Sequence, residues 1–398
     1  MPVARTIAQQ LERASWIRRM FEEGARLKKE RGTENIFDFT LGNPEVEPPV
    51  QTLEALRRIV ERELPGRHGY MPNPGFPEVR SAMAERLHRD SGLDFKAEHI
   101  CMTTGAAAAC NVILKAILDP GDEVILLAPY FAEYPFYVGN HGGRTIVVDT
   151  DATFLPDVAK IAAVITKHTR AILLNTPNNP SGRVYPATVL RDLEAMLSRL
   201  PNPPLVISDE PYKQLVYDGG KQPDVSAHIT HTAICYSWSK AQALAGERIG
   251  FLALSPRLPD AAKMAAACAF ANRTLGFVNA PALWQRVMAA AADACVDVGA
   301  YEHKRNVLCD GLAASGYDVR KPEGGYYVFM KTPIPDDVAF VGLLLKQGIL
   351  AVPGTGFGRG GYIRLSMTVP MNTIERSLPG FERALREAKA PEPGHAQP

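Results

Sequence analysis

A lysine with two nearby hydroxyl groups and an arginine lies in the segment Ser237–Gly250. Lys240 follows an apolar run, Ala233–Tyr236, and such a run ending in polar residues is typical of a buried strand that delivers side chains to the end of a sheet. Burial and nearby cations favour the neutral form of a lysine amine, and a neutral amine can form a Schiff base with an aldehyde. The segment predicts covalent chemistry at Lys240. The alternative is a surface lysine at a strand-to-loop junction.

Three polar residues of the same segment, Ser237, Ser239 and Arg248, have the groups that would bind a phosphate. Hydroxyl groups donate and accept hydrogen bonds, and a guanidinium binds phosphate oxygens with paired N–H groups. A compound that carries both an aldehyde and a phosphate, such as pyridoxal 5'-phosphate, would satisfy the lysine and this clamp together. Ser239 is the less certain of the two serines.

Four motifs, taken in order, resemble those of the class I aminotransferases, which are pyridoxal-phosphate enzymes of fold type I. The matching residues are Asn179–Gly182, Asp209–Tyr212, Ser237–Lys240 with Arg248, and Arg364. Each motif alone is weak, but together they follow the family's order over roughly residues 40 to 370. The resemblance implies an enzyme that moves an amino group from an α-amino acid to a 2-oxo acid such as 2-oxoglutarate. A pyridoxal-phosphate lyase, decarboxylase or racemase on the same fold is the alternative, because the cofactor carries the carbanion chemistry.

The resemblance assigns the catalytic roles to Lys240, Asp209 and Tyr212. Lys240 would hold the cofactor and then move a proton at the substrate α-carbon by general acid–base catalysis. Asp209 follows an apolar strand and would keep the pyridine nitrogen protonated, so that the ring accepts an electron pair. Exchanging this role with Glu210 is the alternative, but we expect Glu210 to be structural. Tyr212 and Asn179 would hydrogen-bond the phenolate oxygen of the cofactor, although Asn179 also suits a turn.

Further cofactor-binding residues are implied by the same resemblance. Gly105, Ala106 and Ala107 would bind the phosphate through backbone N–H groups at a helix start, where many relatives carry a hydroxyl residue. A plain alanine-rich helix start is the alternative. Phe131 would stack on the cofactor, and its neighbour Tyr130 is the competitor for this position.

A loop tyrosine, Tyr70, resembles the residue that reaches the phosphate from a partner subunit in the family. It implies a homodimer with shared active sites. A loop tyrosine without a role is the alternative.

Arg364 lies in an apolar strand, where a buried arginine needs an anion. Its planar guanidinium fits a carboxylate through two parallel hydrogen bonds. The resemblance makes that anion the substrate α-carboxylate, with Gly42 and Asn179 on the same side, and a structural salt bridge is the alternative. Arg273 is only a candidate for reading a second carboxylate, so the preference for neutral or acidic substrates stays open.

Alternating strands and helices must position these groups. Short apolar strands are expected near residues 98–103, 123–127, 145, 171, 205, 233 and 249, with helical segments between them. This alternation predicts an α/β fold with a mainly parallel, seven-stranded sheet sandwiched by helices. Most of the motifs follow the carboxyl ends of these strands, where ligands of such sheets bind.

A second, smaller α+β domain is expected from the change of pattern after residue 285. We expect residues 46–285 to form the large cofactor-binding domain and residues 286–388 to form the small domain. The N-terminal segment, residues 1–45, contains one or two polar amphipathic helices and should pack with the small domain. Residues 389–398 should be a disordered tail.

The bulk composition excludes several other classes of protein. The 398 residues include 44 basic and 43 acidic ones, and the net charge of +1 gives no reason to expect nucleic acid or a membrane surface as a partner. No apolar run approaches the roughly 20 residues of a membrane helix. The six cysteines form no Cys-x-x-Cys pair, which argues against a metal site and suits small buried side chains in the cytoplasm. A ligand-sensing regulator on the same fold would need a DNA-binding module, for which the N-terminal segment is too short.

Overall fold

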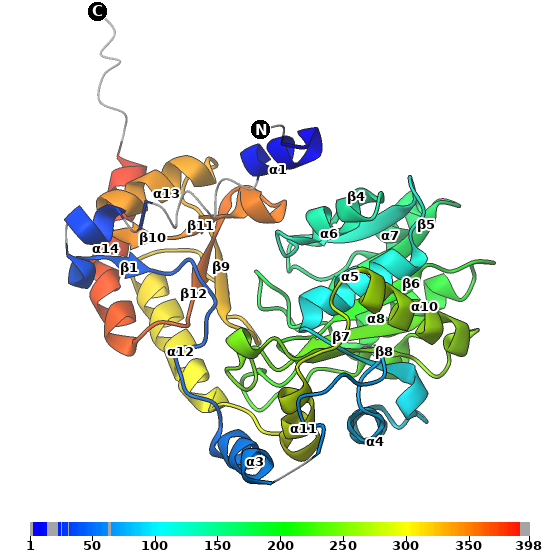
Figure 1. Cartoon of the computed structure of the whole chain (residues 1–398). Helices are drawn as coiled ribbons and strands as arrows, with labels where there is room; N and C mark the ends of the chain where they lie inside the picture. Colours follow the sequence, from blue (N-terminus) through cyan, green and yellow to red (C-terminus); the bar gives the residue numbers. More distant parts are fainter. Residues whose placement is uncertain (1–2, 14–22, 25, 31, 63–64, 391–398) are drawn as a thin grey trace, which may run out of the picture. The chain divides into compact units, whose positions relative to one another are not determined.

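The computed structural model describes residues 3–13, 23–24, 26–30, 32–62 and 65–390. The chain divides into two compact units, which we call the small unit and the large unit (Figure 1). The small unit consists of Met1–Glu45, Asn179–Gly182 and Gly299–Pro398, and the large unit consists of Val46–Asn178 and Arg183–Val298. Most of the tail expected at 389–398 lies outside the described residues.

A seven-stranded sheet forms the centre of the large unit. From one edge to the other, its strands are β2 (Ile100–Thr103), β8 (Gly250–Leu254), β7 (Thr232–Ser237), β6 (Leu205–Asp209), β5 (Thr169–Asn175), β3 (Glu123–Ala128) and β4 (Arg144–Asp149). Neighbouring strands are parallel except at β8, which is antiparallel to both β2 and β7. The structure thus confirms the predicted fold class and sheet.

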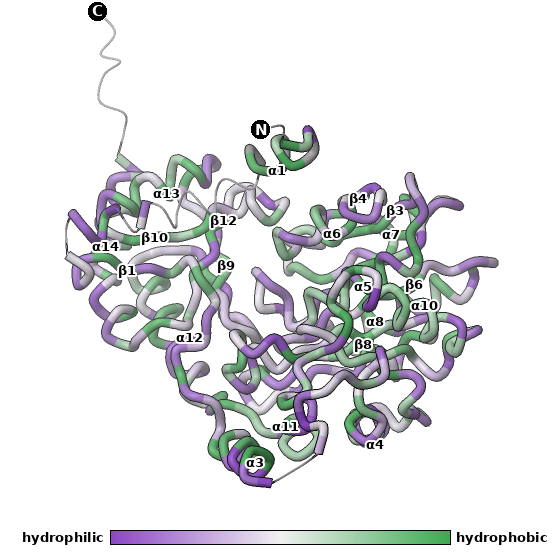
Figure 2. Tube along the Cα trace, viewed as in Figure 1, coloured by the Kyte–Doolittle hydropathy of each residue, from purple (hydrophilic) through white to green (hydrophobic). Residues whose placement is uncertain are grey.

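Helices cover both faces of this sheet (Figure 1). They are α5 (Ala106–Ile117), α6 (Tyr134–Asn140), α7 (Val158–Val164), α8 (Ala187–Leu197), α9 (Val225–His228) and α10 (Ala261–Thr274). Successive strand residues point to opposite faces. Leu173 and Ile207 accordingly pack in one hydrophobic core, whereas Ile172 and Val206 pack in another. Every residue of β6 and β7 is buried, and the apolar strands are visible as hydrophobic stretches in Figure 2.

The large unit extends to Val298, beyond the boundary that the sequence suggested at residue 285. The reason is helix α11 (Ala282–Ala291), which packs against α3 (Val50–Glu61) and α4 (Pro77–Ser91). Val287 of α11 is buried in the same hydrophobic core as residues of α3 and α4. Burial of this apolar face keeps α11 with the large unit.

The small unit contains two short sheets and long helices. Its elements are α1 (Arg5–Arg13), β1 (Phe37–Asp38), α12 (Val298–Ala314), β9 (Tyr327–Lys331), α13 (Asp337–Lys346), β10 (Ile349–Leu350), β11 (Val352–Pro353), β12 (Tyr362–Ser366) and α14 (Met371–Lys389). Strands β11, β12 and β9 form an antiparallel sheet in this order, and β1 pairs in parallel with β10. The second amphipathic helix expected in the first thirty residues falls partly on 14–22, outside the described residues.

Short 3-10 helices complete the list of elements: η1 (Thr33–Asn35), η2 (Ala97–His99), η3 (Ala245–Glu247) and η4 (Gly354–Phe357). In the part of the chain that the structure describes, no helix combines the length and the hydropathy that a membrane span requires.

Candidate active site

The motif residues of the large unit lie where strands β5, β6 and β7 end. In the sheet register Asp209 lies opposite Asn175 on one side and Cys235 on the other. The side-chain amide of Asn175 donates to the backbone oxygen of Asp209 at 2.9 Å and closes this end of the sheet. Ser237 is the last residue of β7, and Lys240 follows in the next turn. The carboxyl ends of three neighbouring strands therefore bring the predicted cofactor residues to one end of the sheet.

The carboxylate of Asp209 is buried, and only one of its two oxygen atoms has a hydrogen-bond partner. The Tyr134 hydroxyl donates a 2.5 Å hydrogen bond to its Oδ2 atom. Its Oδ1 atom is buried and has no hydrogen-bond partner. Burial, with a smaller contribution from the charge of Glu210, raises the pKa of Asp209 from its ordinary value of 3.8 to about 7. Because buried polar atoms are nearly always paired, the Oδ1 atom marks a place for a hydrogen-bond donor from a bound molecule.

The neighbouring carboxylate, Glu210, is engaged in an ion network inside the protein. Its Oε1 atom accepts a 2.7 Å hydrogen bond from Ser208, and its Oε2 atom lies 3.3 Å from Lys213 Nζ. Lys213 also donates to Asp224 at 2.7 Å. These contacts give Glu210 a structural environment, as expected from the sequence.

The turn that carries Lys240 is anchored on both sides of the lysine. Trp238 is fully buried, and its indole N–H donates to the backbone oxygen of Ala292 at 3.0 Å. The buried Gln242 accepts from the Thr52 hydroxyl at 2.9 Å and donates to a backbone oxygen of α11 at 2.7 Å. These buried hydrogen bonds fix the backbone of the turn, so that Lys240, which is itself partly buried, has a defined position.

A cradle for an anion lies at the start of helix α5. Gly105 is the N-cap residue with a φ of 91°, and Ala106 and Ala107 form the first turn with free backbone N–H groups. Arg248 reaches this turn and donates to the backbone oxygen of Thr104 at 3.2 Å. The positive φ of Gly105 favours glycine there, and a Cβ atom at this position would also lie 2.9 Å from Arg248 Nη2.

The serines of the lysine segment lie beside this cradle. Ser237 pairs with Gly250 across β7 and β8, and a Cβ atom at Gly250 would lie 2.9 Å from the Cα atom of Gly105. Both Ser237 and Ser239 are buried. The sheet register thus brings the hydroxyl of Ser237 toward the same helix start as Arg248.

Two neighbouring aromatic residues compete for the stacking position. Phe131 and Tyr130 are both half-buried, and burial raises the pKa of Tyr130. The ring of Phe131 meets the ring of Tyr134 edge to face, with centroids 5.4 Å apart. Phe131 therefore packs against the tyrosine that binds the Asp209 carboxylate. This contact favours Phe131 over Tyr130 as the residue that stacks on a ligand. Tyr70 is 94% exposed in the single chain.

In the small unit, Arg364 is held in place from several sides. Its Nη1 atom donates to Asn179 Oδ1 at 3.1 Å, and its Nη2 atom donates to the backbone oxygen of Thr40 at 2.7 Å. The guanidinium lies over the rings of Tyr327 and Phe357, 4.2 and 4.7 Å from their centroids. The side chain is buried. This arrangement fixes a buried cation in one orientation.

Glycines allow close backbone approaches around Arg364. A Cβ atom at Gly42 would lie 1.8 Å from the Tyr327 hydroxyl oxygen, so no larger residue fits. The segment Asn179–Gly182 belongs to the small unit because the backbone oxygen of Gly182 accepts from the N–H groups of Glu323 and Gly324. Gly42 and Asn179 are therefore grouped with Arg364 in the small unit, whereas the sequence suggested the large domain for Asn179.

The second arginine considered for a substrate carboxylate has a different environment. Arg273 is exposed near the end of α10, and its guanidinium lies 5.2 Å from the centroid of the Phe270 ring.

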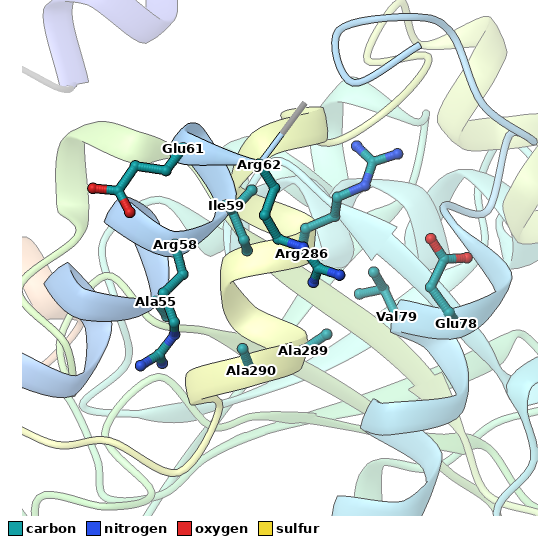
Figure 3. Close-up of a pocket in the computed structure, with 10 residues that line it drawn as sticks. All are labelled: Ala55, Arg58, Ile59, Glu61, Arg62, Glu78, Val79, Arg286, Ala289 and Ala290. Carbon is teal, nitrogen blue, oxygen red and sulfur yellow. The ribbon is translucent and has the colours of Figure 1, made fainter. Parts of the chain in front are cut away.

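A separate groove of about 810 Å³ lies between α3, α4 and α11 (Figure 3). Its floor contains small and branched apolar side chains, and arginines and glutamates surround it: Ala55, Arg58, Ile59, Glu61, Arg62, Glu78, Val79, Arg286, Ala289 and Ala290. No predicted site residue lines this groove, so the motif chemistry lies elsewhere. Among the residues that the structure describes, no group of three histidine, cysteine or acidic side chains could hold a metal ion.

The supporting roles of Tyr134, Trp238 and Gln242 were not predicted from the sequence. The last two are structural supports of the lysine turn, and their type alone does not reveal such a role. Tyr134 lies three residues after Phe131, in the segment that follows an apolar strand. This position near a strand end is the sequence feature that could have indicated a place in the site.

Comparison with known proteins identifies the family of this chain. A family model described as aminotransferase class I and II matches residues 34–379. The chain is 34% identical over 364 residues to the aspartate/prephenate aminotransferase of Thermus thermophilus, covering 89% of this chain and 92% of the relative. It is 30% identical over 367 residues to a probable aspartate aminotransferase of Methanocaldococcus jannaschii, covering 87% and 92%.

Solved structures agree with this comparison. An amino transferase from Eubacterium rectale superposes with a TM-score of 0.94 at 36% identity, covering 98% of this chain and 100% of the other. Aspartate aminotransferase from Thermus thermophilus with maleate has a TM-score of 0.84 at 29% identity, covering 97% and 100%.

The chain belongs to the class I and II aminotransferases. It is a class I enzyme of fold type I that depends on pyridoxal phosphate and transfers an amino group between an amino acid and a 2-oxo acid. The predicted family, activity and cofactor are confirmed, and the comparisons favour transamination over the lyase, decarboxylase or racemase alternative.

The residues present fit this cofactor. The buried Oδ1 atom of Asp209 is an acceptor suited to a protonated pyridine nitrogen. The helix start at Gly105, with Arg248 beside it, is a place for the phosphate. Lys240 follows the same strand end from which Ser237 comes.

Proposed function

We propose that the cofactor is held at the ends of β6 and β7 by Lys240 and Asp209. When bound, pyridoxal phosphate supplies an electron sink for the pair released at the substrate α-carbon. The observation that carries this proposal is the unpaired, buried Oδ1 atom of Asp209, which would accept a hydrogen bond from the pyridine nitrogen. Lys240 would take the proton from the substrate α-carbon as general base and, as general acid, deliver it to the C4' carbon of the cofactor.

Other residues of this site bind and orient. Tyr212 and Asn179 donate hydrogen bonds to the phenolate oxygen; because Asn179 Oδ1 accepts from Arg364, its Nδ2 atom is the donor end. The phosphate is bound by the hydroxyl groups and the guanidinium of the lysine segment and by the start of α5. These residues are Ser237, Ser239, Arg248, Gly105, Ala106 and Ala107. Phe131 rather than Tyr130 stacks on the ring.

Arg364 is proposed to bind the α-carboxylate that donor and acceptor share, with Asn179 and Gly42 beside it. Support comes from its burial and from the hydrogen bonds to Asn179 and to the backbone oxygen of Thr40, which fix its orientation. Its planar guanidinium would bind a substrate carboxylate through two parallel N–H groups.

Replacement of this arginine should weaken every substrate. We expect Arg364→Ala to cost about 2–5 kcal/mol of transition-state binding, because the substrate charge loses its partner. The drop in kcat/KM should be similar for neutral and acidic amino acids, measured in each half-reaction. Arg273→Ala is the matched control and should leave neutral amino acids unaffected. A loss with Arg364→Ala that is confined to dicarboxylates would contradict the α-carboxylate role.

The acceptor is proposed to be a short dicarboxylic 2-oxo acid such as 2-oxoglutarate. Several relatives are named as aspartate aminotransferases, and aspartate is an amino acid with a second carboxylate. A panel of acidic, aromatic and aliphatic donors, each paired with 2-oxoglutarate and with pyruvate, measures the preference. Faster turnover with pyruvate for every donor would contradict this choice.

We also propose a homodimer in which Tyr70 completes the phosphate site of the partner subunit. Tyr70 is 94% exposed in the single chain, so it is available to another subunit.

The six cysteines are all free thiols, which supports a reducing compartment such as the cytoplasm. Recovery of the activity in a membrane or secreted fraction would overturn this location.

Mixing two defective chains tests the shared site. Tyr70→Phe should lower cofactor affinity roughly 10- to 100-fold, because a hydrogen bond to a charged phosphate is lost. Lys240→Ala dimers should be inactive. After random pairing, half of the dimers are hybrids with one intact site, so activity at limiting cofactor should recover to about a quarter of the wild-type value. Activity equal to the sum of the two separate chains, or a fully active monomer in sedimentation, would refute the shared site.

A further inference from the structure

Tyr134 is a buried residue next to the proposed cofactor site whose role the family motifs do not explain. It is the first residue of α6, and its backbone N–H donates to the oxygen of Phe131 at 3.1 Å. Its ring packs in the hydrophobic core that also contains Cys110 of α5 and Cys235 of β7. Its hydroxyl group ends at the Asp209 Oδ2 atom, 2.5 Å away. Among the described residues, the donor to the Asp209 carboxylate is thus a phenol that is itself fixed by packing.

This contact divides the two oxygens of Asp209 into different roles. A carboxylate attached by one side-chain bond can rotate, and either oxygen could then meet a ligand. The Tyr134 hydrogen bond occupies Oδ2 and leaves Oδ1 as the buried acceptor. A fixed acceptor costs no reorganisation when the ligand binds, which is the advantage of preorganised groups.

We propose that Tyr134 is a positioning residue for the cofactor, which orients Asp209 by binding Oδ2 so that Oδ1 receives the protonated pyridine nitrogen. The inference rests on the proposed function, because it assumes that Asp209 faces this nitrogen. Tyr134 acts through Asp209 and does not touch the reacting atoms.

The groups around Asp209 explain why such a donor is needed. Glu210 follows it directly after β6, and the thiols of Cys110 and Cys235 and the hydroxyl of Tyr137, from α5, β7 and α6, lie close enough to interact with it electrostatically. Burial and the charge of Glu210 raise the pKa of Asp209, whereas the Tyr134 hydrogen bond lowers it. The hydroxyl therefore favours the carboxylate form that a pyridinium requires.

A phenol is suited to this task over a wide range of pH. Burial raises the pKa of Tyr134 well above the ordinary value of 10, with the negative charge of Asp209 acting in the same direction. The hydroxyl consequently keeps its proton at every pH at which the enzyme would work, and it remains a donor to Asp209.

An isosteric substitution and a modified cofactor test the proposal. Tyr134→Phe removes the hydroxyl and keeps the ring. Binding to the ligand-free protein is measured with pyridoxal phosphate and with its carbocyclic analogue, in which the ring nitrogen is replaced by a C–H group. We expect Tyr134→Phe to weaken pyridoxal phosphate roughly 10- to 100-fold, as for a lost hydrogen bond to a charged group, and to change the affinity of the analogue less than about threefold.

Tyr137→Phe is the matched control. This tyrosine lies one turn further along α6, with its ring centroid 6.3 Å from that of Tyr134. It should change neither affinity by more than about threefold, because no hydrogen bond joins Tyr137 to Asp209. Equal loss of both ligands in Tyr134→Phe would show a merely structural role, and no loss of either would also overturn the proposal.

A second measurement needs no bound cofactor. The infrared carbonyl band of protonated Asp209, identified by its absence in Asp209→Asn, should disappear at a higher pH in Tyr134→Phe than in the wild type, because a bond that lowers the pKa is lost. An unchanged midpoint would overturn the orienting role. If pyridoxal phosphate binds no more tightly than the analogue in the wild type, and the same holds in Asp209→Asn, then Asp209 does not pair with the ring nitrogen. That result would contradict the proposed function itself.

Discussion

Replacing Lys240 by alanine should abolish transamination. The substitution removes the only amine that the proposed mechanism uses to move a proton at the α-carbon. General acid–base catalysis contributes about 10²–10⁴-fold to rates, so kcat should fall by at least this factor. Pre-steady-state measurement of each half-reaction, with cofactor binding followed separately, checks the prediction.

A second variant separates proton transfer from charge. Lys240→Arg keeps a cation in the lysine turn, but a guanidinium stays protonated in proteins and cannot act as the base. It should be as inactive as Lys240→Ala. Lys221→Ala, at an exposed lysine, should retain wild-type turnover. Substantial activity in Lys240→Arg would mean that another group moves the proton.

Loss of the Asp209 carboxylate should have the next largest effect. Removing one member of a buried ion pair costs about 3–5 kcal/mol, so Asp209→Ala should reduce kcat/KM by roughly two to four orders of magnitude. Some cofactor should still bind, because the phosphate cradle at Gly105 and Arg248 is untouched. Single-turnover rates at saturating cofactor measure the effect on the electron sink.

Two further variants test whether the effect comes from the charge of Asp209. Asp209→Glu keeps the charge and should be less harmful than Asp209→Ala. Glu210→Gln tests the neighbouring carboxylate, whose contacts are with Ser208 and Lys213, and it should affect stability more than turnover. If Glu210→Gln is inactive and Asp209→Ala is not, the two roles have been exchanged.

The order of elements in the large unit could be predicted because its strands are short buried runs bounded by turn residues. β3 and β7 are examples, since all their residues are buried and the segments after them carry Pro129 and Lys240. The position of the motifs after strand ends then followed from the topology of parallel sheets. The end of the large unit could not be predicted in the same way, because packing between α11 and α3 determines it, and these helices are far apart in sequence.

The motif residues could be predicted from the sequence, but the residues that hold them in position could not. Asp209 was recognisable after an apolar strand, whereas its hydrogen bond from Tyr134 depends on how α6 packs against the sheet. The support of the Lys240 turn by Trp238 and Gln242 likewise depends on backbone atoms of residues 291 and 292. Such contacts arise from three-dimensional packing and leave no local pattern in the sequence.

Chemical labelling of the lysine tests the central claim most directly. Borohydride reduction of the protein loaded with pyridoxal phosphate fixes the cofactor to the lysine that holds it, and peptide mapping identifies that residue. The account predicts one labelled peptide, with the label on Lys240, and no label in Lys240→Ala. A stoichiometric label on any other lysine would contradict the assignment of the active site.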